Sequence, residues 1–307
     1  ENPFIIPFNR YPESSQRKLR QKLADFRGVN LKNVLCGNGS DELIDLLIRM
    51  ICEPKKDSIL ICPPTFGMYA VSANLNDVLV EKIDLILNTN SVELDTEKII
   101  NSTAKIFFLP NPTAPLGTIL NSEKVELILK KFKGLVVIDE AYIDFATNES
   151  LVQKIKKYPN LVVLQTFSKY WGMAGLRVGM VFANEIIIEN LLKIKPPYNV
   201  NIFSQQKAIE ALEKVEKFET QKKKLLEERE KLEVFLKAQN WVKKVFSSET
   251  NFLFFEVSGS FENLYDFLLA KGIVVRKFSK LGNFLRISIG TPEENEVLKN
   301  CLNEYVS

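Results

Sequence analysis

Short apolar runs recur through the first two thirds of the chain, and stretches with helical periodicity separate them. Runs of this length are typical of strands buried on both faces, and their alternation with helices is typical of a parallel sheet covered by helices. The runs occupy residues 34–36, 59–62, 105–109, 135–138, 161–164 and 178–183. We therefore predict an α/β fold whose large domain contains a mostly parallel sheet flanked by helices.

The last third of the chain has a different pattern. An amphipathic stretch rich in Lys and Glu runs from residue 204 to about residue 239. Strands near 251–257, 272–276 and 283–289 and a helix near 261–270 then predict a smaller α+β domain. We expect three parts: an N-terminal arm and first helix joining the small domain (1–28), the large domain (29–205), and the small C-terminal domain entered through a long helix (206–307).

Composition excludes several classes of protein. The chain has no histidine, which excludes Ser-His-Asp and Cys-His triads and HExxH zinc sites. Its four cysteines have neither zinc-site spacing nor the density of a disulfide scaffold, so we expect reduced, structural thiols and no metal. A formal charge of +3 is too small to indicate a nucleic-acid partner. No apolar run approaches the roughly 18 residues of a membrane span and no signal-peptide pattern opens the chain, so we expect a cytoplasmic protein without a membrane partner.

Chemically capable side chains follow four of the predicted strands. They lie in residues 63–69, 110–113, 139–142 and 168–169. The carboxyl ends of parallel strands meet at one edge of a sheet, where ligands bind. We therefore expect these segments to form a single active site.

Lys169 and Arg177 are the first candidates within that site. An amine at the end of a buried strand points toward a bound ligand and could act as a nucleophile or form a Schiff base. Arg177 follows two glycines and could return to the same pocket as a fork for a phosphate. The alternative is a surface loop with incidental charges.

A glycine-rich turn at residues 37–42 opens a predicted helix. The unpaired N–H groups and the dipole of a helix N-terminus attract anions. Ser40 or Asp41 could equally be an ordinary N-cap.

Pyridoxal phosphate would use all of these groups together. Its aldehyde needs a lysine, and its protonated ring nitrogen needs a carboxylate. Its phosphate needs backbone N–H groups and an arginine fork.

Several motifs occur together in the order and spacing of one family, at residues 37–43, 64–69, 139–142, 168–169, 174–177, 197–199 and 285–295. On these motifs the chain resembles the fold-type I aminotransferases, and within them the histidinol-phosphate aminotransferases, over almost its whole length. The resemblance implies a mostly parallel seven-stranded sheet, pyridoxal phosphate as cofactor and a homodimer with shared active sites.

The resemblance also implies roles for single residues. Lys169 would form the Schiff base and then move the substrate proton, Asp139 would pair with the pyridine nitrogen, and Tyr142 would hydrogen-bond the ring hydroxyl oxygen. Phe66 would stack on the ring, where relatives often have tyrosine. The remaining roles concern anions. The cofactor phosphate would be held by Ser40, Asp41, Ser168 and Arg177, and Tyr11 would reach it across the dimer interface. The substrate carboxylate or phosphate would be held by Arg286 and Arg276. For these two arginines the alternative is a surface charge at a strand edge.

One loop departs from the family pattern. The family usually has an asparagine before Pro-Thr-Gly, with its side chain on the ring hydroxyl oxygen, whereas residues 111–117 align Ala114 with that asparagine. Either Asn111 or Thr113 replaces it from a shifted loop, or Tyr142 holds the oxygen with less help. We place Asn111 in the cofactor site.

The expected activity is transamination between histidinol phosphate or imidazole acetol phosphate and glutamate or 2-oxoglutarate, in histidine biosynthesis. The partners would be small molecules, a phosphorylated amine and a dicarboxylate. The alternatives of the same fold are a threonine-phosphate decarboxylase and a broad aromatic aminotransferase. A non-catalytic, cofactor-binding regulatory module is the alternative from another class.

Overall fold

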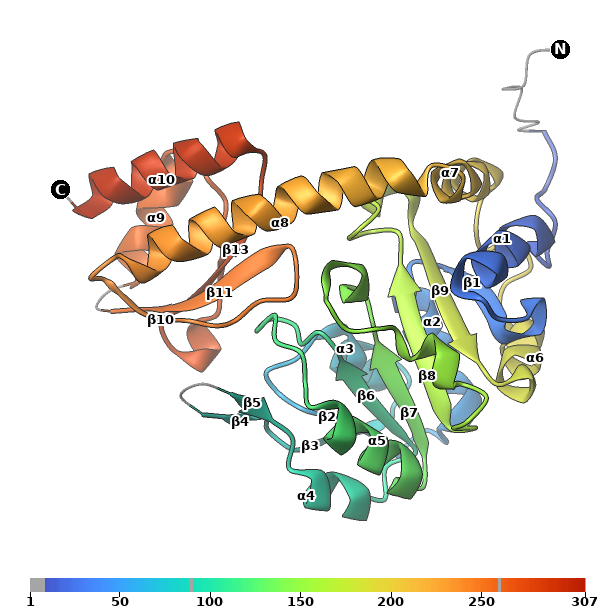
Figure 1. Ribbon diagram of the computed structural model, residues 1–307. Coiled ribbons are helices and arrows are strands. Elements are labelled where there is room, and N and C mark those ends of the chain that lie inside the picture. Colours follow the sequence, from blue (N-terminus) through green and yellow to red (C-terminus); the bar gives the residue numbers. More distant parts are fainter. Residues whose placement is uncertain (1–8, 89–90, 259–260, 307) are drawn as a thin grey trace, which may run out of the picture.

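The computed structural model describes residues 9–88, 91–258 and 261–306 (Figure 1). Its larger sheet has seven strands in the order β1-β9-β8-β7-β6-β2-β3. All of them run in one direction except β9, which is antiparallel to both β1 and β8. The strands are β1 (Val34–Asn38), β2 (Ser58–Ile61), β3 (Leu79–Lys82), β6 (Ile106–Pro110), β7 (Leu135–Asp139), β8 (Leu161–Thr166) and β9 (Val178–Ala183). The predicted mostly parallel sheet is confirmed.

Helices cover both faces of this sheet. Side chains at alternate strand positions point to opposite faces, where they pack with these helices in two separate apolar clusters. In β7, for example, Val136 and Ile138 enter one cluster and Val137 enters the other. One face carries α1 (Arg17–Arg27), α4 (Thr96–Asn101), α5 (Ser122–Lys131) and α7 (Ile202–Leu212). The other carries α2 (Ser40–Ile51), α3 (Met68–Leu75) and α6 (Glu185–Ile194). Burial on both faces is why these strands are continuous apolar runs.

A smaller antiparallel sheet has the strand order β10-β11-β13-β12. Its strands are β10 (Val242–Val245), β11 (Phe252–Val257), β12 (Arg276–Lys277) and β13 (Phe284–Ser288). The helices α9 (Phe261–Ala270) and α10 (Pro292–Val306) lie against it (Figure 1). A short hairpin of β4 (Ile86–Leu87) and β5 (Val92–Glu93) stands apart from both sheets. The remaining regular segments are single 3-10 turns: η1 (Leu31–Asn33), η2 (Ile143–Phe145), η3 (Leu151–Lys154), η4 (Ala174–Leu176) and η5 (Ser279–Leu281).

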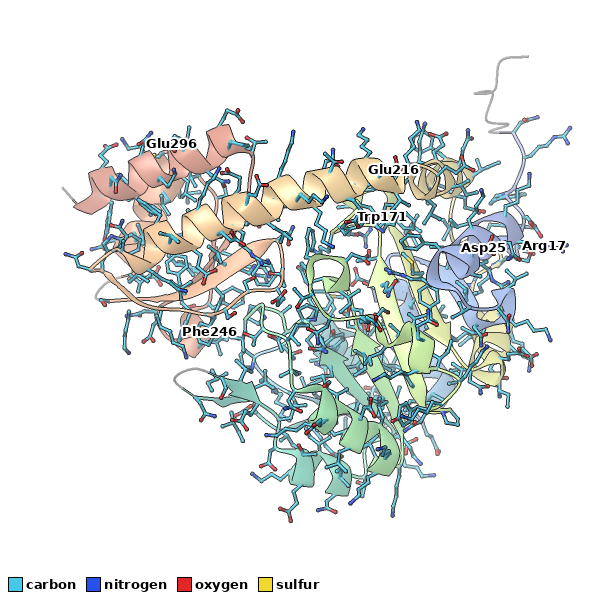
Figure 2. The ribbon with its side chains drawn as sticks, viewed as in Figure 1. Arg17, Asp25, Trp171, Glu216, Phe246 and Glu296 are labelled. Carbon is cyan, nitrogen blue, oxygen red and sulfur yellow. The ribbon has the colours of Figure 1, made fainter. Side chains whose placement is uncertain are left out.

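The long helix α8 (Val215–Lys237) joins the two sheets (Figure 1). Near its start Phe218 packs on Trp171 of the larger part, with ring centroids 5.0 Å apart. Figure 2 shows Trp171 beneath the first turns of α8, close to Glu216. Near its end Leu232 and Leu236 are buried in the apolar cluster of the smaller sheet. One rigid element therefore helps to set the distance between the two parts.

Four details differ from the sequence predictions. The amphipathic stretch 204–239 is two helices, α7 and α8, which break at Glu213 and Lys214. Both residues favour helices, so the break carries no sequence signal. The strand expected at 272–276 is found at Arg276–Lys277. The edge strands β3 and β10 lie outside the predicted strands, because neither forms a buried apolar run.

The antiparallel direction of β9 follows from its connection. A parallel neighbour would require a crossover of about a dozen residues or more, usually a helix. Residues 167–177 between β8 and β9 instead form a loop with one short 3-10 turn. This loop contains Lys169.

The N-terminal helix lies against the larger part. The sequence places residues 1–28 with the smaller domain, whereas α1 contacts β1 and α7 and buries Leu19 and Leu23 in the cluster beneath the larger sheet. Residues 1–8 lie outside the described residues. The boundaries at 28–29 and 205–206 stay a prediction. Among the described residues, no helix has the length and apolarity needed to cross a membrane.

Candidate active site

A cavity of about 220 Å³ lies at the carboxyl ends of the larger sheet's strands, and the smaller sheet contributes to its wall. The strand order places β6, β7 and β8 side by side, so the residues that follow them meet at this edge. Ten of the residues singled out from the sequence line the cavity: Ser40, Asp41, Phe66, Asp139, Tyr142, Ser168, Lys169, Arg177, Arg276 and Arg286.

Asp139 is the last residue of β7, and its side chain is buried. Its Oδ1 accepts a hydrogen bond from the Ala141 N–H at 3.1 Å, and its Oδ2 accepts one from the Tyr69 hydroxyl at 2.7 Å. Burial raises the pKa of this carboxyl, while the two hydrogen bonds and the charge of Lys169 act in the opposite direction. A buried carboxylate held by two donors is suited to face a positively charged ring nitrogen.

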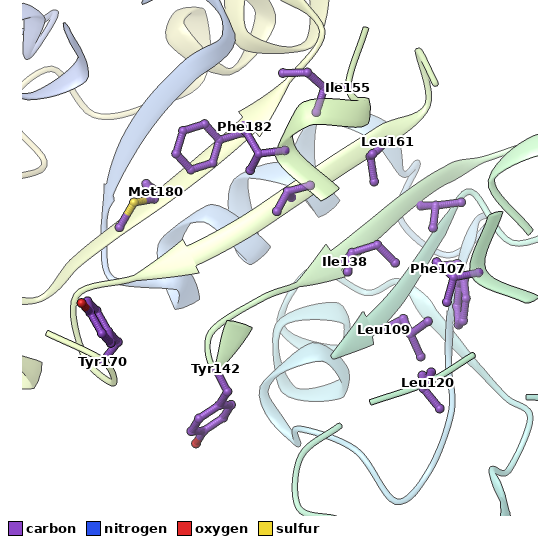
Figure 3. Close-up of a cluster of buried hydrophobic side chains, with 14 of the residues drawn as sticks. Phe107, Leu109, Leu120, Ile138, Tyr142, Ile155, Leu161, Tyr170, Met180 and Phe182 are labelled. Carbon is purple, nitrogen blue, oxygen red and sulfur yellow. The ribbon is translucent and has the colours of Figure 1, made fainter. Parts of the chain in front are cut away.

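Lys169 lies partly buried on the loop between β8 and β9. Its Nζ is 5.3 Å from the centroid of the Tyr142 ring. Tyr142 is buried and packs its ring edge-on against Phe252, with centroids 5.2 Å apart. Figure 3 shows Tyr142 beyond the end of its strand, at one end of the apolar cluster. The amine and the phenol therefore belong to one wall of the cavity.

The turn at the start of α2 forms an anion cradle with Arg177. Gly39 is the N-cap residue, and no side chain caps the first N–H groups of the helix. Arg177 Nη2 lies 3.2 Å from Asp41 Oδ2, and a Cβ at Gly39 would lie only 2.3 Å from the same nitrogen. Gly39 has φ +80°, which also favours glycine. The arginine thus sits directly over the glycine of the turn.

Ser168 faces the same cradle, and its hydroxyl accepts a hydrogen bond from Thr166 Oγ1 at 3.0 Å. Thr166 Oγ1 also lies 3.3 Å from the Val178 carbonyl. The Ser168 hydroxyl has one hydrogen of its own that it can donate to an anion. Uncapped N–H groups, a hydroxyl and a guanidinium are the donors that a phosphate needs.

The two arginines of the smaller sheet are direct cross-strand neighbours, Arg276 on β12 and Arg286 on β13. Arg286 lies over the Phe252 ring, with Cζ 4.7 Å from its centroid. Burial, together with the charge of Arg276, lowers the pKa of Arg286. Among the described residues, neither arginine forms an ion pair with a carboxylate, so both remain available for an anionic ligand.

Comparison with known proteins identifies the family. Residues 6–301 match the family model described as aminotransferase class I and II. The chain belongs to this aminotransferase family. It is 44% identical over 308 residues to the histidinol-phosphate aminotransferase of Parabacteroides distasonis, across 98% of this chain and 88% of that protein.

Solved structures agree with the family assignment. The crystal structure of the histidinol-phosphate aminotransferase from Clostridium acetobutylicum superposes with a TM-score of 0.88 at 28% identity, over 96% of this chain and 90% of that one. The Sinorhizobium meliloti histidinol-phosphate aminotransferase, solved in complex with pyridoxal-5'-phosphate, has a TM-score of 0.87 at 21% identity, over 96% of this chain and 82% of that one. The second likeness concerns the fold alone.

Two residues singled out from the sequence lie away from this aminotransferase's cavity. Asn111 lines a different cavity, and its Oδ1 accepts the Leu120 N–H at 2.9 Å. Ala114 lines the site in its place. Tyr11 is 80% exposed and stacks on Tyr198 of the same chain, with centroids 4.5 Å apart. It does not line the cavity of its own chain.

Two buried polar side chains without a predicted role hold residues of the aminotransferase site. Tyr69 holds Asp139, and Thr166 holds Ser168. Tyr69 lies within the motif at residues 64–69, but only the structure shows which way its hydroxyl points. Pro110, Ala141 and Ala174 complete the lining. Among the described residues, no group of three or more His, Cys, Asp or Glu side chains is placed to hold a metal ion.

Proposed function

We propose that this chain catalyses pyridoxal-phosphate-dependent transamination between histidinol phosphate or imidazole acetol phosphate and glutamate or 2-oxoglutarate. The observation that carries the proposal is the single cavity that contains Lys169, Asp139 and the Gly39–Arg177 cradle, and that Arg276 and Arg286 also line. The 44% identical relative bears the name of this activity. A place in histidine biosynthesis follows from the same substrates.

The residues present fit the cofactor at each of its polar groups. The N–H groups at the start of α2, with Ser40, Asp41, Ser168 and Arg177, would bind its phosphate. When bound, pyridoxal phosphate supplies an electrophilic aldehyde and an electron-withdrawing ring. Asp139 would hold the ring nitrogen, and Phe66 would cover a ring face.

Tyr142 is the candidate donor to the oxygen of the ring hydroxyl group. The polar side chains of the loop at residues 111–117 form hydrogen bonds within the protein. Asn111 Oδ1 accepts from the Leu120 N–H, and Thr113 Oγ1 donates to the Thr118 carbonyl at 3.0 Å. Ala114 offers only a methyl group. The Tyr142 hydroxyl therefore carries this contact without help from that loop.

Lys169 would move the proton of the reaction. Its Nζ would accept the proton from the substrate's α-carbon and return it to the other reacting carbon, as a general base and then a general acid. The partly buried position beside Tyr142 keeps the amine near the reacting atoms.

Arg286 and Arg276 would bind the substrate anions. A phosphate carries close to two negative charges and suits two adjacent guanidinium groups, whereas the distal carboxylate of glutamate needs one bidentate fork. The same pair can thus serve the phosphorylated amine and the dicarboxylate in turn, as a two-substrate transamination requires.

We also propose a cytoplasmic homodimer with shared active sites. Tyr11 supports the shared site, because it is a large exposed aromatic residue that does not line its own cavity. A variant lacking residues 1–11 is expected to lose cofactor affinity in a fluorescence titration, and mixing it with a Lys169→Ala variant should restore some activity.

The direct test is the half-reaction spectrum. Glutamate and histidinol phosphate are each expected to shift the visible band of the reconstituted enzyme, and Lys169→Ala should lower turnover about a thousandfold or more. Lys243→Ala, at an exposed lysine on β10, is the matched control and should retain turnover. Wild-type turnover in Lys169→Ala would refute the assignment.

The same assay separates the alternatives. A threonine-phosphate decarboxylase would release carbon dioxide from threonine phosphate, and a broad aromatic aminotransferase would use phenylalanine as readily as histidinol phosphate. A regulatory module would bind the cofactor without any spectral change on addition of glutamate.

A further inference from the structure

Tyr69 is a buried phenol to which the proposed function assigns no role. It is the second residue of α3, and its side chain has no solvent exposure. Its ring stacks on Phe108, with centroids 4.9 Å apart, and meets Phe66 edge-on at 5.5 Å. This packing aims the hydroxyl at Asp139, where it donates to Oδ2 at 2.7 Å.

Among the residues that the structure describes, each of the two oxygens of Asp139 has one protein donor. Oδ1 accepts from the Ala141 N–H and Oδ2 from Tyr69. A carboxylate oxygen has two lone pairs, so either oxygen can still accept a hydrogen bond from a ligand. The backbone donor is the same for any side chain at 141. Tyr69 is therefore the side chain whose hydrogen bond can be changed by substitution to alter the proton affinity of this carboxylate.

Burial and hydrogen bonding act on Asp139 in opposite directions. Burial raises its pKa, and the hydrogen bond from Tyr69 is the largest opposing effect, ahead of Ala141 and Lys169. Burial likewise raises the pKa of Tyr69 well above its usual value, so its hydroxyl keeps its proton and remains a donor.

We propose that Tyr69 is a positioning residue for the reaction: its hydroxyl holds Asp139 as an oriented anion, so that the proton shared with the pyridine nitrogen stays on the ring. The inference rests on the proposed cofactor chemistry. Asp139 and the ring nitrogen of a bound cofactor would share one proton, which would reside on the group with the higher proton affinity. A carboxylate without the Tyr69 hydrogen bond has a higher proton affinity and draws the proton away from the nitrogen. A neutral ring withdraws electrons less well, and removal of the substrate proton then slows.

The test is Tyr69→Phe, which removes the hydroxyl and retains the ring that stacks on Phe108 and Phe66. The measurement is the nitrogen-15 NMR shift of ring-labelled pyridoxal phosphate bound to the enzyme, which reports whether the nitrogen carries the proton. The ratio of protonated to unprotonated nitrogen is expected to fall about tenfold, because the carboxylate loses a hydrogen bond to a charged group, which contributes at least about 1.5 kcal/mol. In the same variant kcat should fall and the KM for glutamate should change little.

Tyr158→Phe is the matched control. The Tyr158 hydroxyl also donates to a carboxylate, Glu126 Oε2 at 2.9 Å, and Tyr158 is also buried, but it does not line the cavity. A thermal melt of both variants shows whether each is folded. The control should lose a comparable amount of stability and leave the nitrogen-15 shift unchanged.

Two outcomes overturn the proposal. One is a ring-nitrogen shift in folded Tyr69→Phe equal to that of the wild type. The other is an equal change in Tyr158→Phe, which would make the effect a general loss of packing. Failure of the proposed function looks different. If the transamination is wrong, the visible band of the wild type does not change on addition of glutamate, whatever its ring-nitrogen shift. If the cofactor itself is wrong, the wild type gives no ring-nitrogen signal at all.

Discussion

Arg286 illustrates how a single residue acquires its properties from its neighbours. On β11, Phe252 and Phe254 belong to the cluster of the larger part, whereas Leu253 and Phe255 belong to that of the smaller sheet. Arg286 pairs with Phe254 across the strands, so it shares the face that looks toward the larger part. The alternation of one strand therefore decides that this guanidinium faces the cavity rather than the solvent.

The first prediction concerns this arginine. Arg286→Gln should raise the KM for both glutamate and the phosphorylated substrate about tenfold or more, because a hydrogen bond to a charged group contributes about 1.5–3 kcal/mol. Steady-state kinetics with each substrate check this expectation. Arg49→Gln is the control, at a largely exposed arginine paired with Asp45 on α2. Unchanged KM values in Arg286→Gln would remove Arg286 from the substrate site.

At the scale of elements, the start of α2 depends on how closely three segments approach one another. Arg177 lies over Gly39, and a Cβ at Gly179 of β9 would lie 2.4 Å from the backbone of Gly39 and Ser40. The antiparallel β9 thus contacts the backbone of the turn at Gly39 and Ser40, and the loop before β9 places Arg177 against Gly39. A larger residue at Gly179 has no room, whereas one at Gly39 would have to displace the Arg177 guanidinium.

The second prediction tests this cradle with Gly39→Ala. The added Cβ would displace the Arg177 guanidinium and strain a backbone with φ +80°. We expect the apoenzyme's affinity for pyridoxal phosphate to fall about tenfold, which corresponds to about 1.4 kcal/mol. Fluorescence titration measures the affinity. Gly67→Ala is the control, because a Cβ there meets nothing within 4 Å. Equal affinities in Gly39→Ala and the wild type would contradict the cradle.

At the scale of the whole molecule, a polar network connects α1 with the strands behind the site. Arg27 donates to Gln165 Oε1 at 2.8 Å and to Asp144 at 2.7 Å. Gln165 in turn donates to Glu140 Oε2 at 2.9 Å, and Glu140 Oε1 accepts the Leu151 N–H at 2.7 Å. Asp139 precedes Glu140, so this network helps to fix the end of β7.

The third prediction concerns the pH dependence of folding. Burial raises the pKa of Glu140, against the effect of its hydrogen bonds. A carboxyl whose pKa is higher in the folded state stabilises the fold fully below its unfolded value, about 4.3, and loses that contribution as the pH rises through the folded value. Glu140→Gln cannot titrate. The free energy of unfolding of the wild type should therefore be higher than that of the variant. This difference should be largest at pH 4 and should decrease toward pH 7.

Urea unfolding at several pH values measures this difference. Glu256→Gln, at a partly exposed carboxylate paired with Lys243, is the control. A difference that stays constant or widens with pH would show that Glu140 is not held with a raised pKa.

Much of the candidate site could be predicted because strand ends converge in a parallel sheet. Asp139, Ser168 and Lys169 follow apolar runs that the structure confirms as β7 and β8, so their meeting required no further information. Asn111 follows β6 in the same way, yet its side chain turns back to Leu120. The direction of a side chain after a strand end depends on the loop's own hydrogen bonds, which residue spacing does not reveal.

The sequence by itself determined the fold class, the family and the set of chemical groups, because buried periodicity and motif order are local properties of the chain. Only the tertiary structure decided the face of Arg286 and the partner of Tyr69. Each of these depends on contacts between residues far apart in the chain, such as Tyr69 and Asp139, whose hydrogen bond no local pattern encodes.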